Sequence, residues 1–151
     1  MRYAKLVFML LAPAVALMAA DPFVGTWKLN PAKSKFKAGA PYQEATITIS
    51  ESGSDDDVAL KGTAANGAPV SLHYTQPANG GIGKIVEGPF DAVSGKLLNA
   101  RERETRYSKG GKVSYTVHAK VSKDGKTLTI ASKGTNAAGQ AVDGVTVYEK
   151  Q

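Results

Sequence analysis

The sequence predicts an all-β protein, a single up-and-down antiparallel β-barrel of about 8 to 10 strands. Apolar and polar residues alternate with a period of two over most of the chain after residue 43. The alternating segments are short, and turns rich in Gly, Asn and Asp separate them. Evenly spaced short strands of this kind are typical of a sandwich or barrel. Because the strands follow one another as hairpins without long crossovers, we expect a meander that closes on itself.

Length and composition fit one exported globular domain. The chain has 151 residues, 42% of them hydrophobic and 21% charged, which is ordinary for a domain with a packed core. It contains no cysteine, so no disulfide can form. The formal net charge of +6 includes two basic residues in the first 20, and the lysines elsewhere are scattered with few aromatics between them. We therefore expect no nucleic-acid partner.

The first 20 residues predict a secretory signal peptide. Arg2 and Lys5 are basic, residues 6–17 are apolar apart from Pro13, and Met18-Ala19-Ala20 precedes a cleavage site near Ala20. The apolar run is shorter than the ~20 residues of a membrane helix. We expect a periplasmic or secreted domain of residues 21–151, with no stable membrane span after cleavage. Retention of the segment as an N-terminal anchor is the alternative.

The clearest strand pair is residues 112–121 and 127–132. In the first segment, alternate residues from Val113 to Val121 are apolar and share one face, as expected when one side of a sheet is buried. Asp124-Gly125 supplies the tight turn between the segments, because both residues tolerate positive φ. The returning strand then places Leu128 and Ile130 inward.

The same pattern predicts the remaining elements. After a first strand near residue 25, we expect a short helical turn within residues 30–36, where Pro31 suits the first helical position. The further strands are expected at residues 44–51, 58–64, 69–75, 84–87, 97–107 and 142–150. A loop is expected at residues 76–83. Asp55-Asp56-Asp57 forms a short acidic run at a predicted turn. A calcium site would need more oxygen ligands in a fixed order, so we expect these carboxylates to be solvated instead.

Gly25-Thr26-Trp27, at the start of the predicted domain, resembles the Gly-x-Trp signature of lipocalins and their calycin relatives. The resemblance implies that Gly25 and Trp27 are structural, with the indole packed across the closed end of the barrel. Lipocalins often place a late arginine against this tryptophan, and Lys150 is the nearest candidate in this chain.

Two further resemblances concern the rest of the domain. The chain end around Tyr148 resembles the last strand of the fatty-acid-binding branch of calycins, but Thr146 stands where that branch has a carboxylate-binding arginine. That role is therefore not implied. The stretches GTWKLNPAKSKF, VSKDGKTLTI and VYEKQ resemble a group of small exported bacterial proteins, which implies no particular activity.

The charged residues of the predicted 97–107 strand do not indicate which of its two faces points into the barrel. Arg101 and Arg103 share one face, and Glu102 and Glu104 share the other. An inward arginine would suit a polar or anionic ligand. We favour a strand at the barrel rim with both faces wet, because apolar alternation is absent there.

No motif predicts chemistry. His73 and His118 lack metal-ligand spacing, so both are expected to be solvated, and no metal or other cofactor is expected. The chain has no nucleophile elbow, phosphate loop or dinucleotide motif. A barrel enzyme is therefore the least favoured interpretation.

The function predicted from the sequence is binding of a small apolar molecule in the barrel lumen. Tyr74, Tyr115 and Arg101 are the predicted contacts. The alternative is a filled barrel that acts in the cell envelope through loops such as residues 76–83. Barrels of about eight strands include both packed and ligand-holding interiors, so the pattern does not decide between them. Nothing in the sequence predicts an oligomeric state.

Overall fold

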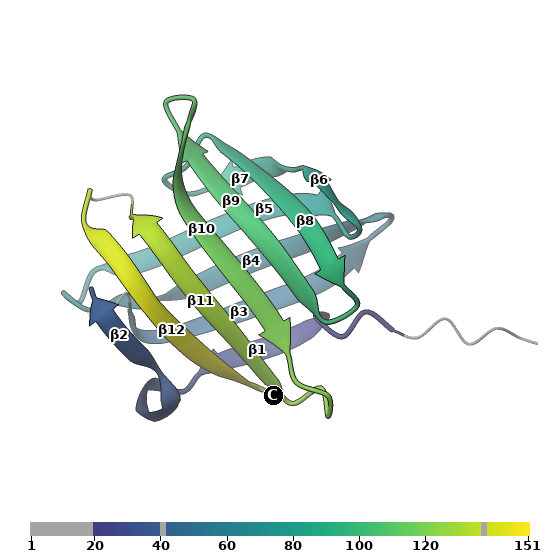
Figure 1. Ribbon diagram of the computed structural model, residues 1–151, viewed down its shortest axis with the longest axis horizontal. Helices are drawn as coiled ribbons and strands as arrows, with labels where there is room; N and C mark the ends of the chain where they lie inside the picture. The colour runs from purple at the N-terminus through teal and green to yellow at the C-terminus, as the bar shows by residue number, and fades with distance from the viewer. Residues whose placement is uncertain (1–19, 40–41, 137–138) are drawn as a thin grey trace, which may run out of the picture.

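A computed structural model of the chain describes residues 20–39, 42–136 and 139–151. The predicted signal peptide, except Ala20, lies outside the described residues. Within these ranges the chain forms twelve strands and one short 3-10 turn, arranged as a nearly closed antiparallel barrel (Figure 1). No helix in the described part is long and apolar enough to cross a membrane.

The strands follow the chain in order. They are β1 (Gly25–Leu29), β2 (Lys35–Ala38), β3 (Tyr42–Ser52), β4 (Asp55–Ala64), β5 (Pro69–Pro77), β6 (Gly80–Ile82), β7 (Lys84–Glu87), β8 (Ala92–Asn99), β9 (Glu102–Lys109), β10 (Lys112–Val121), β11 (Thr127–Thr135) and β12 (Ala141–Lys150), with the 3-10 turn η1 (Pro31–Lys33) after β1. Around the barrel their order is β6-β8-β9-β10-β11-β12-β1-β3-β4-β5-β7. Figure 1 shows β8 to β12 as one wall lying across the wall of β3, β4 and β5. The predicted all-β antiparallel barrel is confirmed.

The first and last strands close the meander. β1 pairs with β12 on one side, where Trp27 faces Lys150, and with β3 on the other. The second junction is a strand switch at Gly83: before it β6 pairs with β8, and after it β7 pairs with β5. The Gly83 N–H donates to the Val93 carbonyl at 2.9 Å. A Cβ on Gly83 would clash with the Thr75 carbonyl, so only glycine fits at this crossing.

Several predicted boundaries need correction. The predicted 97–107 strand is two strands, β8 and β9, joined by a turn at Ala100 and Arg101. The predicted 76–83 loop contains β6, and β4 begins at Asp55, inside the acidic run. The number of strands exceeds the predicted 8 to 10 because β2 and β6 were not predicted and because β8 and β9 were predicted as one strand. The helical turn is confirmed, since Asn30 Oδ1 accepts from the Lys33 N–H at 3.2 Å.

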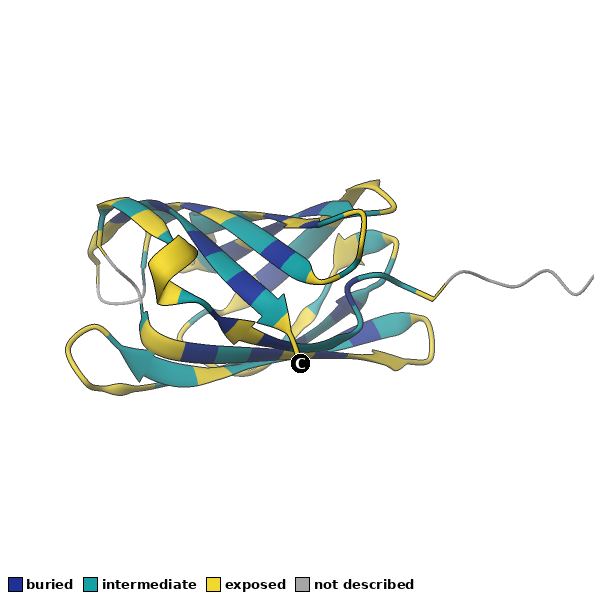
Figure 2. Ribbon diagram, turned by 90° about the horizontal axis from the view of Figure 1, so that it is seen from below, coloured by how far each residue is buried: buried dark blue, intermediate teal, exposed yellow. Residues whose placement is uncertain are grey.

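One end of the barrel is packed solid around Trp27. Its indole is fully buried, and Nε1 donates to the Phe23 carbonyl at 2.8 Å. Phe23 and Leu128 are each 1% exposed beside it. Lys150 Nζ lies 5.0 Å from the indole centroid, so the lysine does take the place expected for a late cation. Figure 2 shows buried and less buried positions alternating along the strands, as the period of two predicts.

Replacing Trp27 with alanine is expected to lower the free energy of unfolding by about 3–5 kcal/mol, because the change empties a fully buried site and orphans the Phe23 carbonyl. Chemical denaturation followed by circular dichroism measures this loss. Leu98→Ala is the control; Leu98 is 43% exposed, so its loss should stay within about 0.5 kcal/mol. Equal losses in the two variants would contradict a closed end built on Trp27.

Candidate functional site

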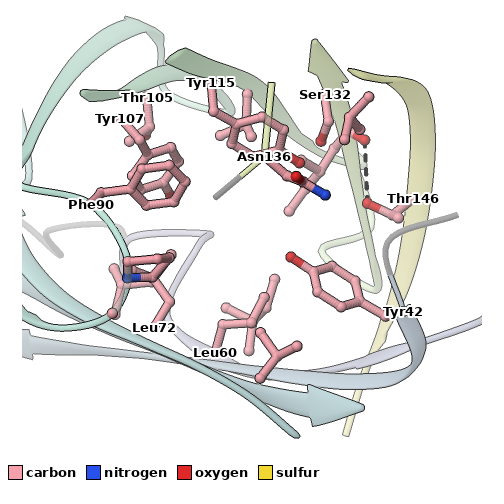
Figure 3. Close-up of a pocket in the computed structure, with 18 of the residues that line it drawn as sticks. Tyr42, Leu60, Leu72, Phe90, Thr105, Tyr107, Tyr115, Ser132, Asn136 and Thr146 are labelled. Atoms are coloured by element: carbon pink, nitrogen blue, oxygen red, sulfur yellow. Dashed lines mark hydrogen bonds between the residues drawn. The ribbon is translucent and has the colours of Figure 1, made fainter. Parts of the chain in front are cut away.

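The barrel encloses a cavity of about 1080 Å³. It runs from the polar group around Arg103 to the loops at the opposite end, including residues 64–66, 68–69 and 87–90. Its walls are mainly apolar and aromatic, with a few amide and hydroxyl groups (Figure 3). Known small-molecule sites are mostly apolar concavities of roughly 300–1,000 Å³, so this cavity has the size and lining of a binding site.

Both walls of the barrel line the cavity. The wall of β3, β4 and β5 contributes Ile47, Leu60 and Leu72 among others. The wall of β9 to β12 contributes large side chains such as Tyr107, Tyr115 and Ile130 together with the small ones of Thr105, Ala119, Ser132 and Thr146. Together these inward side chains do not fill the lumen. The lumen is therefore open. The sequence had not decided between an open lumen and one filled by side chains.

An aromatic cluster forms one side of the cavity. The Phe90 ring stacks on Tyr107 with centroids 5.0 Å apart and lies nearly parallel to Tyr115 at 6.2 Å. Tyr74 meets Tyr107 edge-on at 5.6 Å, and the Tyr107 hydroxyl donates to the Tyr74 hydroxyl at 3.1 Å. Figure 3 shows Tyr42 on the opposite side, with its hydroxyl directed across the space. The cavity thus presents flat rings together with hydroxyl groups.

Every tyrosine after the predicted signal peptide lines this cavity: Tyr42, Tyr74, Tyr107, Tyr115 and Tyr148. Burial raises the pKa of each phenol above its ordinary value, because an ionised phenolate would lose its hydration there. All five phenols therefore stay protonated at neutral pH, and several already bond to one another or to wall hydroxyls, as Tyr107 does to Tyr74.

The floor of the cavity is a buried ion-pair cluster. The Arg103 side chain is 6% exposed; its Nη1 donates to Asp56 Oδ2 at 2.5 Å and its Nη2 to Asp21 Oδ2 at 3.0 Å. The guanidinium lies 3.8 Å from the centroid of the Phe23 ring. Burial raises the pKa of Asp56, and the hydrogen bond and charge of Arg103 oppose that rise.

This floor overturns two predictions. The rim interpretation of the 97–107 strand is wrong for its arginine face, since Arg103 is buried, while Glu102 and Glu104 pair outside with Lys120 and Arg106. The solvated turn predicted for the acidic run is wrong for Asp56, which is fully buried. The physical reason is the same in both cases, since each charge has a partner that lies far away in sequence.

The predicted lumen contacts separate into two groups. Tyr74 and Tyr115 lie on the cavity wall, and their contact with a ligand stays a prediction. Arg101 is absent from the lining residues, because its Nη1 donates to the Ser122 carbonyl at 2.8 Å near the β10–β11 turn. Arg103, two residues later and inside β9, lines the floor instead. Alternation placed the two arginines on one predicted face, but Arg101 lies in the turn before β9.

The histidines lie elsewhere. His73 Nε2 lies 3.0 Å from Asp57, with both side chains about one third exposed, and His118 Nε2 lies 3.4 Å from Glu102. Among the residues that the structure describes, no three His, Cys, Asp or Glu side chains gather as a metal site would require. Sequence reasoning missed Tyr42, Phe90 and Gln76, which all lie outside the predicted strands, so that no alternating pattern marked them as lining.

Known proteins resemble this chain in structure and not in sequence. No protein-family model matches the chain, and no curated protein matches it by sequence. Among solved structures it is similar to zebrafish ileal bile acid-binding protein complexed with cholic acid, with a TM-score of 0.48 and 16% sequence identity over 86% of this chain and 99% of that one. The strand pairing and the cavity define the class, an antiparallel β-barrel with an open interior.

When the folded domain, prepared without its signal peptide, is titrated to alkaline pH, none of its tyrosines should ionise at the ordinary pKa near 10. Near pH 10 the unfolded chain loses its phenolic protons while the folded chain keeps them, so stability falls as the pH rises above about 10. Tyrosinate absorbance should therefore appear together with loss of circular dichroism, and the chain in denaturant should titrate at the ordinary value. Tyrosinate formation near pH 10 with the fold intact would contradict the enclosure of these rings.

Proposed function

We propose that the protein binds a small, largely apolar molecule in the barrel cavity. The observation that carries this proposal is the apolar, aromatic-lined space of about 1080 Å³. Apolar surface moved from water into such a site gains about 25 cal/mol per Å² before the cost of association. The amide and hydroxyl groups on the walls would fix the orientation of the ligand.

The alternative functions have less support. The open lumen gives no support to a filled barrel, and residues 80–82 of its proposed working loop are strand β6. A buried charged cluster is one sign of catalysis. In this chain, however, Arg103 is bound by two carboxylates and Asp56 is not among the cavity-lining residues. The cluster therefore supports a structural floor better than a reacting group.

We extend the proposal to location. Arg2 and Lys5 followed by the apolar residues 6–17 support export, with action in the periplasm or outside the cell. Native mass spectrometry of the protein from its exported fraction tests both parts. A stoichiometric small molecule on a chain that begins near Asp21 is the expected result.

Blocking the cavity should abolish binding while the fold persists. Ile130 lines the cavity on β11, whereas its neighbour Ala131 is exposed. Ile130→Trp is expected to weaken binding of the neutral apolar dye Nile red at least about tenfold, because the indole takes up the ligand's space. Ala131→Trp is the matched control and should bind as the unchanged chain does.

Fluorescence titration gives both affinities, and circular dichroism checks the fold of each variant. Equal dye affinity in the two variants would place the dye on the outer surface and contradict binding in the lumen. Failure of the unchanged protein to take up any apolar molecule, together with a bare mass, would contradict the function itself.

A further inference from the structure

We propose that the cavity selects an uncharged ligand, with a hydroxyl or carbonyl group at its polar end, and rejects anions. This inference rests on the proposed function and names its ligand class. It is carried by the distribution of charge around the cavity, independently of the apolar lining that supports binding as such.

The cavity offers no unpaired positive charge. Among its lining residues in the described part of the chain, Arg103 is the only Lys, Arg or His. One terminal nitrogen of its guanidinium donates to Asp56 and the other to Asp21. A ligand carboxylate at this floor would meet a guanidinium whose charge is already compensated by two protein carboxylates. Arg103 is therefore not an anion receptor.

The net charge of the floor is not positive in either protonation state of Asp56. With both aspartates ionised, the cluster carries a net charge of −1, and with one of them protonated it is neutral. The other charged lining residue, Glu87, is an acid on the exposed rim. An anion inside the cavity would therefore lose its hydration and meet neutral or negative surroundings, where burial of an unpaired charge is strongly unfavourable.

Neutral polar groups, in contrast, find partners. Gln76 is 3% exposed, lines the cavity and lies opposite Asp56 in the pairing of β4 and β5, so an amide stands beside the floor. Thr105 and Ser132 add hydroxyls on the walls, and the tyrosine hydroxyls donate as well as accept. The stacked Phe90, Tyr107 and Tyr115 rings present flat apolar faces. A neutral ring system with a hydroxyl or carbonyl group matches this set.

The test uses fluorescent probes that share one skeleton and differ in the end group. The purified protein is titrated at neutral pH with 4-(1-pyrenyl)butanol, 4-(1-pyrenyl)butyrate, its methyl ester and the corresponding amine. The alcohol and the ester are expected to bind at least about tenfold more tightly than the butyrate. Butyrate binding equal to or tighter than alcohol binding would overturn the inference, and so would preferred binding of the amine.

A variant with a new cation provides the converse result. Ile130→Arg places a permanently charged guanidinium on the cavity wall without a protein carboxylate beside it. It is expected to raise the affinity for the butyrate relative to the alcohol at least about tenfold, whereas Ala131→Arg, on the outer face, should leave the ratio unchanged. An unchanged ratio in a folded Ile130→Arg variant would overturn the inference.

The outcomes separate this inference from the proposed function. Binding of all four probes with equal affinity would keep the cavity as a binding site and remove its selectivity. Binding of none, with Nile red also excluded, would overturn the binding function and the inference with it. If the Ile130→Arg variant fails to fold, the comparison of probes on the unchanged protein still decides whether the cavity prefers an uncharged end group.

Discussion

The closed end of the barrel depends on one enclosed charge. Arg103 comes from β9 and Asp56 from β4, which lie on opposite walls, while Asp21 belongs to the segment that precedes β1. Their contact joins both walls and the start of the domain at a single point. Removing one partner of such a buried pair typically costs roughly 3–5 kcal/mol, because the remaining charge is left without compensation.

The rest of the architecture follows from that floor. Phe23 lies against the Arg103 guanidinium, and its carbonyl accepts from the buried indole of Trp27, so these residues close this end of the barrel. Towards the other end the apolar residues of the core line the cavity and do not fill it. A rigid base and an open lumen are compatible because different inward positions of the same strands serve each one.

The sequence predicted what depends on local pattern. Alternation from Val113 to Val121, with the Asp124-Gly125 turn, predicted a hairpin whose observed register places Val121 opposite Leu128. The position of Trp27 predicted its burial at the barrel base. The floor could not be predicted in this way, because Asp56 and Asp21 lie 47 and 82 residues from Arg103. Nor could the cavity be predicted, since alternation shows which residues point inward but not how far apart the two walls lie.

The crossing at Gly83 has a mechanical consequence. One continuous segment, residues 80–87, hydrogen-bonds first to β8 and then to β5, so within the described residues β7 and β8 are not joined by a ladder. Elsewhere the circumference is fixed by rows of backbone bonds that must break together. At this seam the covalent chain through Gly83, the bond from the Gly83 N–H to the Val93 carbonyl and side-chain packing replace a backbone ladder. The circumference of the barrel is therefore held there by a single residue crossing rather than by a row of hydrogen bonds.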